Sequence, residues 1–301
     1  MPKLAIIIPY YKIAFFKDTL VSLENQTCKD FSLYIGNDCS PDDPLKLIEE
    51  ILQKTAYHYK RYSKNLGGEN LVAQWERVID ESADEEWIMI LGDDDVISEN
   101  FVEEFYKNMK SAEDSNCNVI KFSQCWIDEQ GIQLNDFTCY AKLIDPSEHL
   151  GYKILNAERS SLSEHIFRKK QLAKIKFKDF PLGWGADDVA VFEISQRNLI
   201  YFINEAKVYV RVSSENISGR RDNLDKKKQA KITFEKYLIK NHYRCLTKET
   251  LKKLVDQQMY YRYHDNLPLG FSLFKAYLHL RLYRKILTLP KTFLILNKII
   301  K

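Results

Sequence analysis

The stretch Trp87-Ile88-Met89-Ile90-Leu91-Gly92-Asp93-Asp94-Asp95 sets three carboxylates directly behind a short apolar run. The apolar residues predict a buried strand, and the aspartates would lie where that strand leaves the sheet. Three adjacent carboxylates repel one another unless a cation lies close to them. Hard divalent cations such as Mg²⁺ prefer oxygen ligands, and they often bind one or two carboxylates together with substrate phosphates. The stretch therefore predicts a metal-assisted phosphate site, with a solvated acidic loop as the alternative.

Strand-like and helix-like segments alternate on both sides of this stretch. The strand-like runs cover residues 4–8, 31–35, 57–62, 87–91 and 119–122. Helical spacing is most regular in the apolar set Leu71, Val72, Trp75, Val78 and Ile79. Such alternation is typical of an α/β fold in which helices cover a mostly parallel sheet.

Polar clusters follow three of the predicted strands. They are Pro9-Tyr10-Tyr11, Asn37-Asp38-Cys39-Ser40 and Asp93-Asp94-Asp95. In open α/β sheets, ligands bind outside the carboxyl ends of the strands. Three clusters at one edge of the sheet therefore predict a ligand site there.

The second half contains one sharp motif, Leu182-Gly183-Trp184-Gly185-Ala186-Asp187-Asp188-Val189. Glycines on both sides of the tryptophan allow a tight loop and a close approach of the backbone. The two acids could simply complement the dipole of a helix that begins there. In the functional interpretation, Trp184 is a platform for the apolar face of a sugar. A neighbouring carboxylate would then accept the proton of a hydroxyl nucleophile.

The composition indicates a globular protein with a large core. Hydrophobic residues make up 45% of the 301 residues and charged residues 29%, with a net charge of +3. The six cysteines form no C-x-x-C pair and no zinc spacing, so we expect reduced thiols in a cytoplasmic protein. The N-terminus shows no signal-peptide pattern, and no stretch reaches the ~18–20 apolar residues of a membrane span.

The C-terminal region is basic. Residues 219–231 predict a linker, either a solvated charge run or a loop that contacts phosphate, and residues 232–301 predict a helical appendage. An apolar stripe follows helical spacing between residues 271 and 288, flanked by basic side chains. It consists of Leu273, Ala276, Leu280, Tyr283 and Leu287. Two readings stay open: residues 271–301 contact a membrane surface, or the helix packs on the protein's own core.

Six short motifs occur in order between residues 3 and 218. They are Ile8-Pro9-Tyr10-Tyr11, Gln26-Thr27, Asn37-Asp38-Cys39-Ser40, Asn65-Leu66-Gly67-Gly68, Gly92-Asp93-Asp94-Asp95 and Gly183-Trp184-Gly185-Ala186-Asp187-Asp188. Each motif alone is weak, but their order and spacing resemble the family 2 glycosyltransferases. Val210-Arg211-Val212-Ser213 through Ile217-Ser218 also resembles a stretch that closes the donor site in that family.

The resemblance implies a GT-A type, Rossmann-like fold over residues 1–218. Residues 1–125 would form the nucleotide-sugar-binding half and residues 126–218 the acceptor-binding half. The implied activity is metal-dependent, inverting, hexosyltransferase-type transfer from a UDP-sugar to a hydroxyl of a saccharide or lipid-linked acceptor. Surface polysaccharide synthesis is the implied pathway, in the cytoplasm or at the inner face of the membrane.

The same resemblance assigns roles to individual residues. The donor site would include Pro9, Tyr11, Asp38, Asn65, Gly67, Asp93 and Arg211. Asp94 and Asp95 would bind Mn²⁺ or Mg²⁺, Asp188 would be the catalytic base, and Trp184 and Asp187 would bind the acceptor. Two positions depart from the family pattern: Gly92 stands where an Asp is frequent, and Ser213 stands where a His is frequent.

Two other interpretations remain. A sugar-phosphate nucleotidyltransferase also needs a metal and a nucleotide, but it usually has a Gly-rich loop after the first strand, which Pro9-Tyr10-Tyr11-Lys12 lacks. A membrane-docked scaffold of the same fold, without catalysis, would fit the departures at Gly92 and Ser213. Nucleic-acid binding is not expected, because the basic tail is apolar-striped rather than lined with stacking aromatics and arginines.

Overall fold

The computed structural model describes residues 2–156, 158–214, 224–265 and 270–282, and it divides into two compact units. The first unit holds Met1–Pro146 and Ser160–Leu224. The second holds Ser147–Arg159 and Asp225–Lys301. The chain therefore leaves the first unit after Pro146, returns at Ser160, and leaves it again after Leu224.

Nine strands of the described residues form one sheet in the first unit. They are β1 (Leu4–Tyr10), β2 (Ser32–Asn37), β3 (Tyr57–Arg61), β4 (Trp87–Ile90), β5 (Val96–Ile97), β6 (Val119–Ile127), β7 (Leu143–Ile144), β8 (His165–Arg168) and β9 (Ile200–Arg211). Their order is β3-β2-β1-β4-β8-β6-β9-β5, and β7 pairs with β9. The strands β3, β2, β1 and β4 are parallel, and β6 is parallel to β9. Strand β8 runs antiparallel to both of its neighbours.

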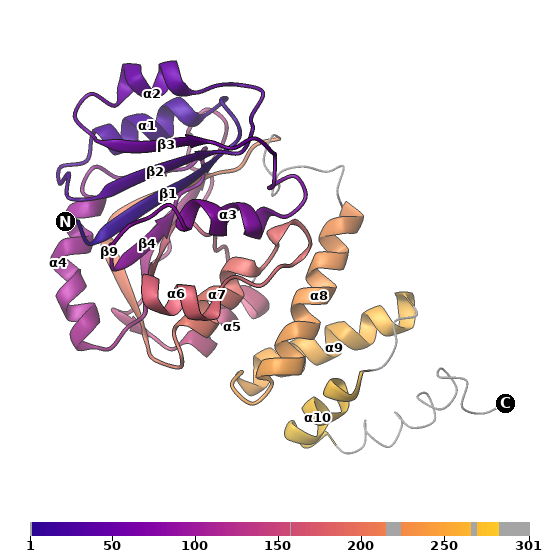
Figure 1. Cartoon of the computed structure of the whole chain (residues 1–301). Helices are drawn as coiled ribbons and strands as arrows, with labels where there is room; N and C mark the ends of the chain where they lie inside the picture. The colour runs from indigo at the N-terminus through magenta and orange to yellow at the C-terminus, as the bar shows by residue number, and fades with distance from the viewer. Residues whose placement is uncertain (1, 157, 215–223, 266–269, 283–301) are drawn as a thin grey trace. The chain divides into compact units, whose positions relative to one another are not determined.

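Helices cover both faces of the parallel part of the sheet. Figure 1 shows α1 (Phe16–Glu24) and α2 (Leu45–Ile51) on one face and α3 (Leu71–Ile79) on the other. Strand β1 is apolar on both faces, as a strand between two helical layers must be. At Gly36 of β2, a Cβ atom would lie only 2.3 Å from Val78 of α3, so the missing side chain lets this helix approach the sheet.

The predicted α/β fold is confirmed. The predicted strands correspond to β1, β2, β3, β4 and β6, and α4 (Phe101–Asp114) lies between β5 and β6 in the sequence. The apolar set on α3 is placed as the helical spacing predicts, because Val72, Trp75 and Val78 are buried. Strands β5, β7, β8 and the long strand β9 were not predicted from the sequence.

The second half of the first unit adds shorter elements around strand β8. They are α6 (Lys169–Ile175), the 3-10 turn η1 (Pro181–Gly183) and α7 (Ala186–Ile194). All three follow β8 directly in the chain, and they carry the Gly-Trp-Gly motif and the two acids behind it.

The second unit is helical in its described residues. It comprises most of α5 (Pro146–Asn156) and of α8 (Leu224–His242), together with α9 (Lys248–Asp265) and α10 (Phe271–His279). The predicted appendage is confirmed as helical, but two boundaries need correction. Helix α8 begins at Leu224, so residues 224–231 are helical rather than linker, and residues 219–223 lie outside the described part. Residues 147–159, which were expected in the acceptor half, cluster with these helices instead.

Helix α8 packs through an apolar stripe that begins at the end of the lysine-rich run. Ala230, Phe234 and Leu238 are buried at helical spacing, and the turns before Ala230 extend the same helix with mostly exposed side chains. Within the described residues, no helix combines the length and the apolar character needed to span a membrane. The stripe predicted at residues 271–288 is partly described: Leu273 and Ala276 are buried. Tyr283 and Leu287 lie outside the described residues.

Candidate active site at the carboxyl edge of the sheet

Asp93 ties together the loops that follow β1 and β4. Its Oδ2 accepts hydrogen bonds from the backbone N–H groups of Tyr11, at 2.7 Å, and Lys12, at 2.8 Å. Burial and the neighbouring charge of Asp94 raise the pKa of Asp93 to about 7. The first of the three acids therefore connects two strand ends, as expected for clusters that share one edge of the sheet.

Asp95 points into the protein and holds the acidic loop, residues 92–95, in place. It is only 5% exposed, and its Oδ1 accepts the backbone N–H of Arg211 at 2.8 Å. Its Oδ2 accepts a hydrogen bond from the Ser163 hydroxyl, and the same hydroxyl accepts the N–H of Gly92 at 3.0 Å. Burial, followed by the charge of Asp94, raises the pKa of Asp95 well above its ordinary value.

The packing around Asp95 also explains why position 92 is a glycine. A Cβ atom on Gly92 would lie 2.8 Å from Asp95 Oδ2 and 3.1 Å from Asp94 Oδ1. An aspartate at position 92 would therefore clash with the loop as it is folded here. The departure from the frequent family pattern follows from the inward position of Asp95.

Arg211 fixes the acidic loop from the other side. Its side chain is 2% exposed and pairs with Asp18 Oδ2 at 2.8 Å. The Nε atom donates to the carbonyl of Asp94 at 3.0 Å, and Nη1 donates to the carbonyl of Asp128 at 2.9 Å. The guanidinium also lies over the ring of Phe15, 4.6 Å from its centroid. These contacts make Arg211 a positioning group, and a direct contact with a diphosphate stays a prediction.

Asp38 organises the loop that precedes α3. It is 3% exposed, and its carboxylate accepts the N–H groups of Leu66 and Gly67, both at 2.7 Å. The Arg77 guanidinium donates a further hydrogen bond to it. A Cβ atom on Gly67 would lie 2.7 Å from Asp38 Oδ2, so glycine is needed for this approach. Asn65 Oδ1 accepts the N–H of Gly68 at 2.7 Å and completes the turn.

The Gly-Trp-Gly loop is packed against the start of α3. Leu182, Gly183 and Gly185 all have positive φ angles, of 62°, 65° and 81°. A Cβ atom on Gly183 would lie 3.1 Å from Leu71, and Asn70 Nδ2 donates to Asp179 Oδ2 at 2.8 Å. The loop from the second half therefore lies beside the helix that follows the Asp38-bound turn.

Helix α7 begins directly after this loop and carries both predicted carboxylates in its first turn. Asp188 is 4% exposed, whereas Asp187 and Trp184 are half-buried. The structure therefore shows a buried Asp188 in the first turn of α7. Its role as the catalytic base stays a prediction.

Several residues of the site were not identified from the sequence. Ser163 precedes β8 and holds Asp95. Directly after it, Glu164 forms a fully buried ion pair with Lys121 of β6, at 3.1 Å. The sequence signal was a run of polar residues at 159–161 and 163–164 before a short apolar strand, which indicated a loop but not its partners.

The carboxylate oxygens of Asp93, Asp94 and Asp95 suit a cation that also binds substrate phosphates. Among the described residues, no three His, Cys, Asp or Glu side chains form a group that could hold a metal ion. Burial first, and the charge of Asp94 second, raise the pKa values of Asp93 and Asp95, and a bound cation would favour their charged forms. Mg²⁺ commonly binds through one or two carboxylates plus phosphate oxygens, so a closed protein cage is not required.

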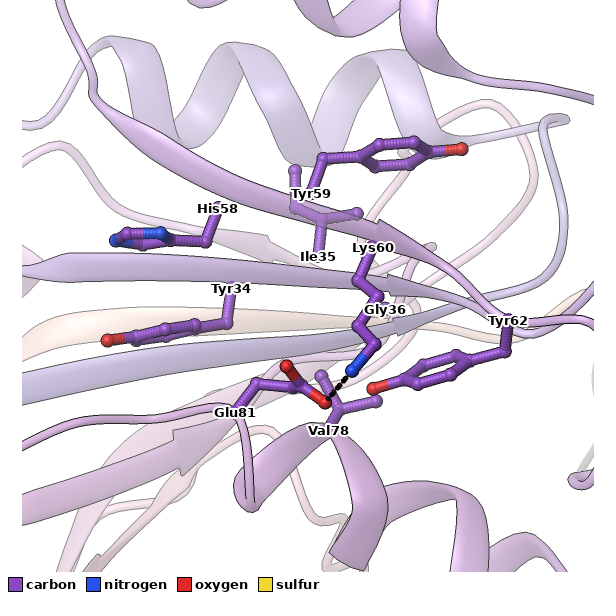
Figure 2. Close-up of a pocket in the computed structure, with 9 residues that line it drawn as sticks. All are labelled: Tyr34, Ile35, Gly36, His58, Tyr59, Lys60, Tyr62, Val78 and Glu81. Carbon is purple, nitrogen blue, oxygen red and sulfur yellow. Dashed lines mark hydrogen bonds and ion pairs between the residues drawn. The ribbon is translucent and has the colours of Figure 1, made fainter.

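A cavity of about 250 Å³ lies between β2, β3 and the C-terminal end of α3. Figure 2 shows Tyr34, His58 and Lys60 among its lining side chains, with Lys60 paired to Glu81. One lining residue, Tyr62, contacts the Arg77 guanidinium, 3.8 Å from its ring centroid, and Arg77 in turn donates to Asp38.

Comparison with known proteins gives a family and a fold. Residues 5–159, just over half of the chain, match the family model described as glycosyl transferase family 2. No curated protein sequence matches significantly.

Among solved structures, residues 1–349 of Staphylococcus aureus TarS in complex with UDP match with 15% identity and a TM-score of 0.60. That match covers 87% of this chain and 72% of the other. The same fragment with UDP-GlcNAc gives 15% identity and a TM-score of 0.59, over 84% of this chain and 71% of the other. The longer TarS structure gives 17% identity and a TM-score of 0.59, over 84% of this chain and 42% of the other. At such identities the structural likeness shows the fold alone, and the family model carries the assignment. The chain belongs to glycosyl transferase family 2.

Proposed function

We propose that this protein is an inverting, metal-dependent transferase that moves a sugar from a UDP-sugar to an acceptor hydroxyl. The observation that carries the proposal is the acidic loop, which is joined by hydrogen bonds to the loop after β1 and lies at the same sheet edge as the Asp38-bound turn. The TarS fragment holds UDP and UDP-GlcNAc in its structures, which favours a uridine donor here.

On the donor side, Pro9, Tyr11, Asp38, Asn65, Gly67 and Asp93 would form the nucleotide-sugar site. The backbone contacts of Asp93 and Asp38 give this edge a fixed shape before any donor binds. Asp94 would be the first metal ligand, because it is more exposed than the internally bonded Asp95. A bound Mn²⁺ or Mg²⁺ would supply charge stabilisation for the leaving diphosphate.

On the acceptor side, Asp188 would accept the proton from the attacking hydroxyl. The acceptor oxygen then bonds to the anomeric carbon from the face opposite the diphosphate, and the bond between that carbon and the diphosphate oxygen breaks. Trp184 would support the acceptor sugar ring, and Asp187 would bind its hydroxyls. A positioned carboxylate base contributes roughly 10²–10⁴ in rate.

The acceptor would be a saccharide or a lipid-linked saccharide, in surface polysaccharide synthesis. A lipid-linked acceptor would bring the reaction to the inner face of a membrane. A non-catalytic scaffold has less support, because the glycine at position 92 is explained by its packing against Asp95.

Donor binding and turnover can be tested separately. Thermal unfolding with UDP should show a metal-dependent rise in the apparent stability, since a ligand that binds only the folded state stabilises it. Asp94→Ala should abolish that rise. Asp188→Asn should keep it while reducing turnover by roughly 10²–10⁴. The matched control is Asp136→Asn, an exposed loop carboxylate. Wild-type turnover in Asp188→Asn would show that the base has been wrongly assigned.

A further inference from the structure

Helix α10 is apolar on two faces, and only one of them is buried. Leu273, Ala276 and Tyr277 are 7%, 0% and 2% exposed, so they belong to the core of the helical unit. Phe271 and Leu278 are 69% and 43% exposed. The sequence predicted an apolar stripe through Leu273 and Ala276. In the structure these two residues pack inside the helical unit. The face that remains available to a partner is the opposite one.

The outer face of α10 consists of Phe271, Phe274, Lys275 and Leu278. At 100° per residue, these four positions fall within an arc of about 100°. The rings of Phe271 and Phe274 stack with their centroids 5.9 Å apart. The Lys275 ammonium lies 5.1 Å from the centroid of Phe271. Aromatic side chains and a cation are thus gathered on one surface, the α10 outer face.

The charge of the surrounding sequence limits the chemistry of a partner. Residues 266–301 contain seven basic residues and no acidic one. Lys275 and Arg281 are both exposed. A partner must therefore offer anionic groups next to an apolar layer. Anionic phospholipids offer both, with phosphates at the surface and acyl chains directly below them.

A second exposed apolar site lies among acidic residues, which disfavour binding to an anionic surface. Ile132 and Leu134 are 63% and 51% exposed, in a loop of the first unit. Their neighbours in the sequence are acidic, at Asp128, Glu129 and Asp136. Single exposed apolar residues are normal on soluble proteins, and these carry the wrong charge for an anionic surface. They provide a matched control for the α10 outer face.

We propose that the α10 outer face binds an anionic lipid surface. Phe271 and Leu278 enter the region between headgroups and acyl chains, where aromatic and apolar side chains are favoured. Lys275 and Arg281 lie at the lipid phosphates. The buried stripe through Leu273 and Ala276 keeps α10 attached to its own unit while the outer face contacts the lipid.

The test is co-sedimentation of the full chain with lipid vesicles. Vesicles of phosphatidylcholine are compared with vesicles that contain about 30% phosphatidylglycerol. We expect binding to the anionic vesicles, weakened when the salt concentration rises from about 0.1 M to about 0.5 M. Lys275→Gln should reduce the affinity about fivefold, the effect of one basic residue near such a surface, and Lys110→Gln should not. Phe271→Ser with Leu278→Ser should reduce it about tenfold or more, and Ile132→Ser with Leu134→Ser should leave it unchanged.

Each result decides the proposal. Equal binding by the Phe271→Ser/Leu278→Ser variant and the wild type would overturn it. Failure of the wild type to bind anionic vesicles would also overturn it. Self-association that is lost in the same variant would then assign the face to a second copy of the chain. The assay needs neither donor nor acceptor, so a negative result leaves the proposed transferase activity standing. Unfolding curves confirm that both pairs of exposed substitutions leave the fold intact.

Discussion

Replacing Ser163 with alanine should destabilise the protein and loosen the acidic loop. The hydroxyl donates to Asp95 Oδ2 and accepts the N–H of Gly92, and Ser163 and Asp95 are only 3% and 5% exposed. The substitution leaves one buried donor and one buried acceptor without a partner. Each unsatisfied group costs about 1–3 kcal/mol, so we expect a loss of about 2–6 kcal/mol in the free energy of unfolding.

Urea denaturation measures this loss, since the free energy of unfolding falls linearly with urea concentration. The matched control is Ser214→Ala, which removes an exposed hydroxyl bonded to Glu129 and should change stability by less than about 0.5 kcal/mol. We also expect weaker metal-dependent stabilisation of Ser163→Ala by UDP, because Asp95 and Gly92 flank the proposed metal ligand Asp94. If Ser163→Ala unfolded at the same urea concentration as Ser214→Ala, the brace would not exist as described.

Three further predictions follow from named contacts. The pKa of Asp93 is raised to about 7, so its contribution to stability is full below pH ~4 and is lost as the pH rises through about 7. Unfolding curves across this range should show that loss, and saturating Mn²⁺ should reduce it. Arg262 is 4% exposed, and none of its guanidinium nitrogens has a hydrogen-bond partner among the described residues. Arg262→Met should therefore stabilise the protein by about 1–4 kcal/mol, and a measured loss of stability would show that the charge is paired in solution. Gly67→Ala should weaken UDP binding while leaving the helical unit unchanged, since the new Cβ would lie 2.7 Å from Asp38 Oδ2; calorimetric titration with UDP measures this.

The sequence was sufficient for the parallel part of the sheet and for the clustering of polar residues at its edge. Strands buried on both faces appear as continuous apolar runs, such as Leu4–Tyr10, and these are visible without a structure. The polar residues behind them share an edge because parallel strands end together. Asp38 and Asp93 were identified on this basis.

The roles of the same carboxylates could not be read from the sequence. Asp93, Asp94 and Asp95 are identical in type and adjacent, yet Asp93 binds two backbone N–H groups and Asp95 is braced from within. Asp95 differs from Asp93 because it contacts Ser163 and Arg211. These residues lie 68 and 116 positions after Asp95 in the chain. Periodicity reports local structure, and it carries no information about such distant partners.

The helical unit shows a second limit of pattern reasoning. The basic residues at 219–231 predicted a linker, yet residues 224–231 form the first turns of α8. The buried positions Ala230, Phe234 and Leu238, most of which lie beyond the basic run, anchor this helix. Likewise, helical spacing detected an apolar stripe on α10 but could not tell which apolar face would be packed.

The position of the antiparallel strand β8 affects how the sheet can form while the protein is being translated. It lies between β4 and β6 in the sheet, yet it follows both of them in the chain, after the segment 147–159 that belongs to the helical unit. While the ribosome is still translating that segment, β4 and β6 each present an unpaired edge. Exposed strand edges are prone to pairing with other chains. The edges of β4 and β6 that face each other are therefore joined only after Ser163 and Glu164 are added, and the acidic loop gains its contact with Ser163 in the same step. The other edge of β6 and the contacts of Arg211 wait for β9.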